Sequence, residues 1–343
     1  MPLIHRWYRR RTWVVAHLLC VFGGFCGNAE AQPPVPTPQA PERIIIDTDI
    51  GDAIDDPFAI ALALRSPELD ILGISTDYGD TQGRAKILDR MLGEAGRQTI
   101  PVAVGAATSL FPSADSYASA HALDQRRYGE GGHFARTSHP HAVEFILDQI
   151  RRFPGEITLV TIGPLPNIGA LIDTSPETFR KLKRVVMMGG SIAPGKSEYG
   201  DAPPAGPVAE WNVMLDITAA QKLFRSGVTV YMMPVDSTEH LKLDEVKRTV
   251  LFAHGTPLTD ALTLLYHQWS AAGGVTPTLY DVMTIAYILD PQLCPVQPMH
   301  IRVDDRGFTR VEDGTPNAQV CLHSDADTVL RFYMQRILAP GAL

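Results

Sequence analysis

Short apolar runs alternate with helical patterns along most of this chain, and this alternation constrains the fold more than any other feature. The first run, Ile44–Ile46, is apolar at consecutive positions, as expected of a strand buried on both faces. Such strands, when separated by helices, form a parallel sheet covered on both sides. We therefore expect an α/β fold with an open, mostly parallel sheet flanked by helices and a Rossmann-like core. The expected strands are Arg43–Asp47, Leu69–Thr76, Pro101–Val104, Ile157–Ile162, Arg184–Met188 and Val228–Met232, and the expected helices are Asp55–Arg65, Gln82–Ala95, His141–Phe153, Leu165–Asp173 and Ile217–Ser226.

The chain is expected to consist of a leader, a spacer and one folded domain. Residues 1–31 combine a basic start, a short apolar stretch and Ala29-Glu30-Ala31, an order typical of a secretory signal peptide. Residues 32–41 are rich in proline and are expected to form an extended linker. The folded domain is then 42–343, and the protein is expected to be exported, to the periplasm or out of the cell. After Asp290 the domain is expected to end in the strands Met299–Val303, Phe308–Val311 and Ala318–Leu322 and the helix Asp325–Ile337.

Charge and cysteine content narrow the function classes. The formal net charge is −8 and the chain beyond the leader has no basic cluster, which argues against nucleic acid as a partner. Only Cys294 and Cys321 lie beyond the leader, and their spacing does not fit a zinc site. They are expected to form one disulfide in an oxidising compartment or to be two buried thiols.

Five carboxylates follow the first strand within ten residues: Asp47, Asp49, Asp52, Asp55 and Asp56. Carboxylates this close repel one another unless a positive charge lies among them, and a hard divalent cation prefers oxygen ligands. Pro57 suits the first turn of the following helix, with Asp55 or Asp56 as its cap. Because ligands of parallel sheets bind at the carboxyl ends of strands, this cluster marks the expected metal site.

Three other interpretations of the acidic cluster compete with that of a metal-dependent enzyme centre. An EF-hand loop starting at Asp47 would need Gly at position 52 and Glu at position 58, where Asp and Phe stand. A haloacid-dehalogenase-like phosphatase also begins with Asp-x-Asp, but it would need Thr or Val at position 51, where Gly stands. Helix capping alone would account for one or two acids, not five.

Segments far from this cluster extend the pattern in a fixed order. The opening Asp47-Thr48-Asp49-Ile50-Gly51, followed by Asp55-Asp56, resembles the first motif of the inosine–uridine-preferring nucleoside hydrolases, calcium-dependent N-ribohydrolases. The resemblance then covers most of the folded domain, and it implies the nucleoside hydrolase fold. The matching segments are Gly73–Asp80, Pro101–Gly105, Leu159–Asn167, Val185–Gly190, Ala209–Val213, Pro234–Thr238 and Tyr280-Asp281.

The resemblance implies a Ca²⁺ site and a set of sugar contacts. The implied metal ligands are the carboxylates of Asp49, Asp56 and Asp281 and the backbone carbonyl of Ile162. Asp49 is also the implied general base, which would take a proton from a calcium-bound water. The implied substrate contacts are Asp55, Asp80, Met188, Glu210, Trp211, Asn212 and Tyr280.

This sequence departs from the family pattern at several positions. Two extra residues lie between Gly51 and Asp55, so Asp52 could compete with Asp55 for a role. Asp80 replaces the usual asparagine of the second loop. Tyr280 stands where many members have a histidine close to the leaving base. A tyrosine hydroxyl has a pKa of about 10, so it donates a proton poorly at neutral pH, although it can form a hydrogen bond.

The expected function is hydrolysis of the N-glycosidic bond of ribonucleosides to free base and ribose. The first alternative is a nucleoside- or ribose-binding protein that keeps the metal site without turnover. The second is a Mg²⁺-dependent phosphatase of the haloacid-dehalogenase type. Family members are usually dimers or tetramers, so the resemblance also implies a homo-oligomer, with a small nucleoside as the other partner.

Overall fold

The computed structural model describes residues 40–107, 125–130, 134–193 and 206–341. The expected leader 1–31, and the expected linker 32–41 except its last two residues, lie outside the described residues. Residues Ala40–Leu343 form one compact unit. Within the described residues, no helix is both long and apolar enough to cross a membrane.

The strands agree with those expected from the sequence to within a few residues. β2 and β5 have the expected bounds, and β1 extends one residue further at each end. The strands are β1 (Glu42–Thr48), β2 (Leu69–Thr76), β3 (Val102–Val104), β4 (Ile157–Thr161), β5 (Arg184–Met188), β6 (Val230–Met233), β7 (Val296–Val303), β8 (Thr309–Glu312) and β9 (Ala318–Cys321).

The helices expected between these strands are present, and several more lie between β5 and β7. The α-helices are α1 (Asp55–Leu64), α2 (Thr81–Glu94), α4 (Arg126–Glu130), α5 (Ala142–Arg152), α6 (Pro166–Thr174), α7 (Pro176–Phe179), α8 (Trp211–Met214), α9 (Ile217–Arg225), α10 (Val235–Thr238), α11 (Glu245–Phe252), α12 (Pro257–Ala271), α13 (Val282–Leu289) and α14 (Ala326–Ile337). A 3₁₀ turn, η1 (Pro291–Leu293), follows α13.

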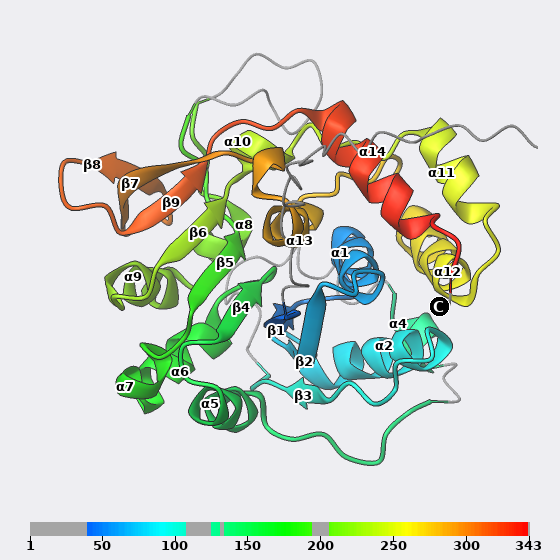
Figure 1. Ribbon diagram of the computed structural model, residues 1–343, viewed down its shortest axis with the longest axis horizontal. Coiled ribbons are helices and arrows are strands. Elements are labelled where there is room, and N and C mark those ends of the chain that lie inside the picture. The colour runs from blue at the N-terminus through cyan, green and yellow to red at the C-terminus, as the bar shows by residue number, and fades with distance from the viewer. Residues whose placement is uncertain (1–39, 108–124, 131–133, 194–205, 342–343) are drawn as a thin grey trace, which may run out of the picture. The chain divides into compact units, whose positions relative to one another are not determined.

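The strands form a nine-stranded sheet in the order β3-β2-β1-β4-β5-β6-β9-β7-β8 (Figure 1). The strands from β3 to β9 in this order are parallel, while β7 and β8 are antiparallel to their neighbours. The chain runs outward from β1 to β3 on one side and then returns to place β4 on the other side of β1. The strand order therefore reverses between β1 and β4, and open α/β sheets bind ligands at such a switch point.

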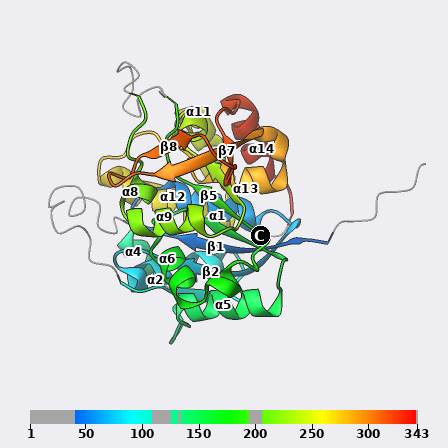
Figure 2. The same cartoon turned by 90° about the vertical axis from the view of Figure 1, so that its left-hand side faces the viewer.

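The two faces of the sheet are covered by different helices (Figures 1 and 2). Side chains alternate along β1, so that Ile44 and Ile46 join the core beneath α1 and α13, while Ile45 joins the core beneath α5 and α6. This alternation explains why the apolar run of β1 is continuous.

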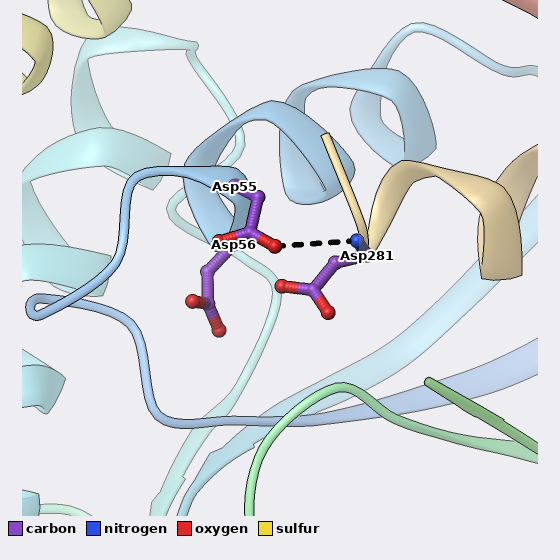
Figure 3. A group of neighbouring side chains, drawn as sticks. All are labelled: Asp55, Asp56 and Asp281. Carbon is purple, nitrogen blue, oxygen red and sulfur yellow. Dashed lines mark hydrogen bonds between the residues drawn. The ribbon is translucent and has the colours of Figure 1, made fainter. Parts of the chain in front are cut away.

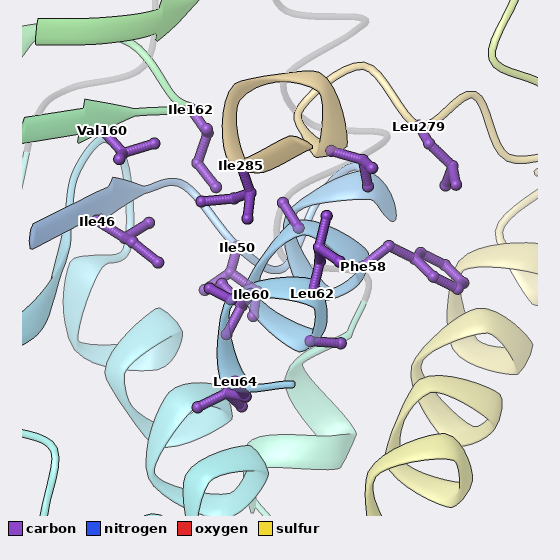
Figure 4. Packing of buried hydrophobic residues seen from close by; sticks show 14 of the residues in the cluster. Ile46, Ile50, Phe58, Ile60, Leu62, Leu64, Val160, Ile162, Leu279 and Ile285 are labelled. Carbon is purple, nitrogen blue, oxygen red and sulfur yellow. The ribbon is translucent and has the colours of Figure 1, made fainter. Parts of the chain in front are cut away.

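Helix α1 is the centre of the first core. All ten of its residues are buried, because the sheet covers one side and α12, α13 and α14 cover the others. Figure 4 shows apolar side chains of α1 beside Ile285 of α13. A helix enclosed in this way needs apolar residues on all its faces, which matches its sequence after the two initial acids. The burial of α1 also holds those two acids at a fixed place above the sheet.

A disulfide joins the C-terminal strands to the turn after α13. Cys294 and Cys321 are bonded, with Cα atoms 5.6 Å apart, and both side chains are buried. Of the two states expected for these cysteines, the structure therefore shows the disulfide.

Candidate metal centre

The acidic cluster lies at the carboxyl end of β1 and on the first turn of α1. The helix begins at Asp55, and its N-cap is Ile54, whose side chain cannot accept a hydrogen bond. The expectation that Asp55 or Asp56 caps α1 was therefore wrong. Both acids instead lie in the first turn, where the positive end of the helix dipole favours a negative charge.

Asp281 meets these two acids from the other end of the chain (Figure 3). Asp55, Asp56 and Asp281 each offer an oxygen atom within 4.8 Å of the others, and all three side chains are buried. The backbone N–H of Asp281 donates to Oδ2 of Asp55 at 3.4 Å. Three buried carboxylates at this distance form a set of oxygen ligands for a hard divalent cation.

Burial and mutual repulsion disfavour the charged form of these acids. Burial raises the pKa of Asp55 to about 6. Burial, together with the neighbouring carboxylates, raises the pKa values of Asp56 and Asp281 well above the ordinary range. A bound cation would reverse this balance, because opposite charge favours the ionised form. The residues present therefore fit a divalent metal ion.

Asp49 lies next to this group rather than within it. Its side chain is partly exposed, and its charge contributes to the raised pKa values of Asp56 and Asp281. Burial, with added repulsion from Asp52 and Asp55, raises the pKa of Asp49 to about 7. The group of three close carboxylates thus contains Asp55, which was expected as a sugar contact. It does not contain Asp49, which was expected as a metal ligand. The roles of both residues remain predictions.

The end of β4 passes directly beside Asp49. The N–H of Ile162 donates to the carbonyl of Asp47 at 2.9 Å, which continues the pairing of β4 with β1. A Cβ atom on Gly163 would come within 2.9 Å of Oδ1 of Asp49 and within 2.8 Å of Oδ1 of Asp77. Position 163 therefore has no room for a side chain, and Ile162 is held at the switch point beside the acids.

Several polar residues that hold the acids in place were not predicted from the sequence. Oγ1 of Thr48 donates to Oδ1 of Asp56. Oδ1 of Asp47 accepts from Oγ of Ser75 at 2.5 Å and from Nδ2 of Asn167 at 2.8 Å. A usable signal was present, because Ser75 lies near the carboxyl end of β2 and Asn167 begins the helix that follows β4, and these strands are the two neighbours of β1.

The predicted sugar contacts Met188, Glu210 and Asn212 come together at the carboxyl end of β5. Glu210 caps α8 and accepts from the N–H groups of Asn212 at 2.9 Å and Gly190 at 2.8 Å. Nδ2 of Asn212 donates to the carbonyl of Met188 at 3.2 Å. All three predicted contacts are buried, and Trp211 beside them is partly exposed.

The two remaining predicted contacts lie in different surroundings. Asp80 is exposed, caps α2 by accepting from the N–H of Gly83 at 2.9 Å, and forms an ion pair with Arg126 at 3.1 Å. The structure does not place it in the group of buried acids. Tyr280 is partly buried and directly precedes Asp281.

Comparison with known proteins identifies the family. The sequence model described as inosine-uridine preferring nucleoside hydrolase matches residues 44–331. The pyrimidine-specific ribonucleoside hydrolase RihA of Citrobacter koseri is 32% identical over 315 residues, which cover 86% of this chain and 97% of that protein. RihA of Salmonella typhimurium is also 32% identical, with the same coverage.

Solved structures agree with this assignment. A plant nucleoside hydrolase, PpNRh1, has a TM-score of 0.73 and 26% identity, covering 88% of this chain and all of that one. A purine-preferring ribonucleoside hydrolase from Gardnerella vaginalis has a TM-score of 0.74 and 25% identity, covering 87% and 98%. The chain thus belongs to the inosine-uridine preferring nucleoside hydrolase family, and it is a hydrolase that cleaves the N-glycosidic bond of ribonucleosides.

Proposed function

We propose that this protein hydrolyses ribonucleosides with a bound divalent cation, and that the cation is Ca²⁺. The observation that carries the proposal is the meeting of Asp55, Asp56 and Asp281, which are buried within 4.8 Å of one another although two distant segments supply them. Ca²⁺ accepts six to eight oxygen ligands in flexible geometry, which suits a mixed set of carboxylates and carbonyls. The residues proposed to hold it are Asp49, Asp56, Asp281 and the carbonyl of Ile162.

Asp49 is proposed to be the general base. With a cation bound beside it, the carboxylate of Asp49 keeps a low pKa, so Asp49 would be a weak base that depends on the easier deprotonation of the attacking water. Water attacks C1′ of the ribose, and its proton passes to Oδ of Asp49. The C1′–N bond breaks, and its electron pair leaves with the base. When bound, the cation neutralises the carboxylates and makes deprotonation of the attacking water easier.

The carboxylates also suit the charge that develops on the sugar. The transition state of this bond cleavage resembles an oxocarbenium ion, which is positively charged. Asp55 and Glu210 are proposed to accept hydrogen bonds from ribose hydroxyls, and fixed negative groups beside the ring stabilise the developing charge. Met188, Asn212 and Asp80 are proposed to complete the sugar contacts.

Trp211 and Tyr280 are proposed to contact the leaving base or the sugar. Both residues are partly exposed in the described structure. An indole ring offers a flat surface for stacking, and a phenol offers a hydrogen bond.

Export and self-association complete the proposal. The leader pattern supports export to the periplasm or the cell exterior, and the Cys294–Cys321 disulfide is of the kind that persists in oxidising compartments. The proposed assembly is a homodimer or homotetramer, which light scattering of the purified protein tests directly.

The deciding experiment is a nucleoside panel with detection of released ribose. Protein treated with a chelator is assayed alone, with Ca²⁺ and with Mg²⁺. The proposal expects ribose release that disappears on chelation and returns with Ca²⁺. Full activity of the metal-free protein would contradict the metal role. Nucleoside binding without ribose release at saturating Ca²⁺ would instead indicate a binding protein.

A further inference from the structure

Arg84 is a buried cation that contacts the acidic loop at three points. This residue of α2 is 2% exposed. Its Nη2 forms an ion pair with Oδ2 of Asp52 at 2.7 Å, and its Nη1 donates to the carbonyls of Asp49 and, at 3.0 Å, Ile50. Arg84 therefore holds the backbone of the residue proposed as the general base.

The same guanidinium also secures the neighbouring turn. Nε of Arg84 donates to the carbonyl of Tyr78 at 2.7 Å. Tyr78 has a φ of 56°, in the left-handed region that is unfavourable for a side chain of this size. The contact holds this turn, between β2 and α2, against the loop between β1 and α1. The two segments follow β2 and β1, which are neighbouring strands, at the carboxyl edge of the sheet.

Asp52 lies in the stretch between Gly51 and Asp55, which is two residues longer than in the family motif. A longer loop has more freedom, and Asp49 lies at its start. Arg84 binds the carbonyls of Asp49 and Ile50, while Gln125 binds the other half of the loop through the carbonyls of Gly51 at 3.1 Å and Ala53 at 2.6 Å. The lengthened stretch therefore contains a carboxylate, Asp52, that forms an ion pair with Arg84, the residue that holds the loop.

Burial of Arg84 makes counter-charges necessary, and Asp52 supplies one of them beside Asp49 and Asp77, all three of which raise the pKa of the guanidinium. A buried arginine without a counter-charge is strongly destabilising, because its desolvation is not compensated. Asp52 is partly exposed, with 24% of its side chain accessible, yet its oxygen reaches the buried guanidinium. The planar guanidinium of Arg84 binds a carboxylate and three carbonyls at once, which a lysine ammonium cannot do with the same geometry.

We propose that Arg84 and Asp52 are positioning residues that fix Asp49 in the orientation needed for proton abstraction and for metal binding. The expected effect of these two residues on turnover rests on the proposed function. Their expected effect on Ca²⁺ binding is a separate consequence, which can be measured without a nucleoside.

The test compares Arg84→Gln and Asp52→Asn with a matched pair on the same helix. Arg90 and Glu94 form an ion pair at 2.7 Å on α2, and Arg90 also donates to the carbonyl of Tyr128 at 2.9 Å. Arg90→Gln and Glu94→Gln therefore remove an α2 ion pair that is not bound to the acidic loop. Calorimetry with Ca²⁺ alone and steady-state kinetics at saturating Ca²⁺ are measured for all four variants and the wild type.

The two variants change the local charge in opposite directions, which separates positioning from through-space electrostatics. Arg84 also lowers the pKa values of Asp49 and Asp56, so the calorimetry is done at alkaline pH, where these carboxylates are ionised. There, loss of a positive charge in Arg84→Gln would by itself tighten Ca²⁺ binding, and loss of a negative charge in Asp52→Asn would weaken it. Positioning predicts that both variants weaken Ca²⁺ binding about tenfold or more, the size usual for groups that orient metal ligands. It also predicts that kcat falls about 10- to 100-fold with little change in KM.

Tighter Ca²⁺ binding in Arg84→Gln, or kcat values within twofold of the Arg90→Gln and Glu94→Gln controls, would overturn the inference. If Arg84→Gln does not fold, Arg84→Lys takes its place, because it keeps the positive charge and loses only the planar guanidinium. Unchanged Ca²⁺ affinity and kcat in Arg84→Lys would equally overturn the inference. Wild-type protein that binds Ca²⁺ but releases no ribose would refute the proposed function, while the Ca²⁺ affinities would still decide whether the pair positions Asp49.

Discussion

The backbone N–H of Asp281 donates to the carboxylate of Asp55 across 226 residues of sequence (Figure 3). This bond joins the first turn of α1 to the residue that precedes α13, and the two helices pack against each other along their lengths. The core between them therefore sets the distance between the carboxylates. Closing this core forces the three acids together, and a bound cation would offset the repulsion that results.

The first prediction concerns Asp281→Asn. Removing one carboxylate should raise the melting temperature of the metal-free protein, because repulsion within the group decreases. The variant should also lose stabilisation by Ca²⁺, which at 100 times the dissociation constant is worth about 2.7 kcal/mol in the wild type. Thermal unfolding with and without Ca²⁺ measures both effects. Asp290→Asn, at the other end of α13, is the control and should keep the Ca²⁺ response.

The second prediction concerns pH. Burial raises the pKa values of Asp47 and Asp55 to about 6 and that of Asp49 to about 7, from an ordinary value of 3.8. The folded protein thus binds more protons than the unfolded chain between these limits. The stability that these groups contribute is complete below about pH 4 and is lost as the pH rises to about 7.

Urea unfolding of metal-free protein at pH 5 and pH 8 tests whether the free energy of unfolding falls as the pH rises. The wild type should lose stability between these values relative to Asp49→Asn, by an amount on the order of 2 kcal/mol. Saturating Ca²⁺ should reduce the difference, because the metal binds the ionised carboxylates. Equal pH dependence in the two metal-free proteins would show that Asp49 is not desolvated.

The architecture was largely predictable from local sequence because it depends on short periodic patterns. The bounds of β2 and β5 were correct, since each apolar run ends at a clear change in polarity. Helix α12 was not predicted, although Thr256 and Thr259 form a capping box at its start. The place of β9 between β6 and β7 was also not predicted, because it depends on long-range pairing rather than on local pattern.

The family motif led to some residues of the candidate site, but Asp49 lies outside the group of close carboxylates and Asp80 is exposed. Asp56 and Asp281 do meet in the structure, as the resemblance implied. The role of Arg84 could not be inferred, because an arginine in a helix is usually on the surface. Its contact with Asp52 depends on how α2 packs beside the loop after β1, which no spacing in the sequence encodes.

The third prediction tests the support of Asp56 by Thr48. Thr48→Val keeps the shape and removes the hydroxyl that donates to Oδ1 of Asp56. Loss of such a supporting bond commonly weakens metal affinity about 10- to 100-fold, and a change in this range is expected for Ca²⁺. Thr161→Val is the matched control, because its buried hydroxyl has no hydrogen-bond partner among the described residues. Calorimetry with Ca²⁺ should separate the two variants, and equal affinities would remove Thr48 from this role.

The fourth prediction concerns Glu210→Gln. The carboxylate of Glu210 accepts from three backbone N–H groups, those of Gly190, Asn212 and Val213. An amide would turn one acceptor into a donor, so the variant should lose about 1 to 2 kcal/mol of stability and bind ribose more weakly. Asp216→Asn changes another capping acid, at α9, and should alter stability without raising KM. A KM for Glu210→Gln no higher than that of Asp216→Asn would limit Glu210 to a structural role.

The fifth prediction separates two aspartates that lie two residues apart on either side of Thr48. Asp49 is partly exposed at the site, whereas Asp47 is fully buried and bonded to Ser75 and Asn167. Asp49→Asn should fold normally and lose about 10²- to 10⁴-fold in kcat, the range expected for loss of a general base. Asp47→Asn keeps an oxygen that can accept both bonds but puts an NH₂ group at the buried Oδ2 position, which has no hydrogen-bond partner among the described residues, so it should mainly change the melting temperature. Single-turnover assays at saturating Ca²⁺ distinguish the two variants, and a kcat for Asp49→Asn within tenfold of the wild type would assign proton abstraction to another group.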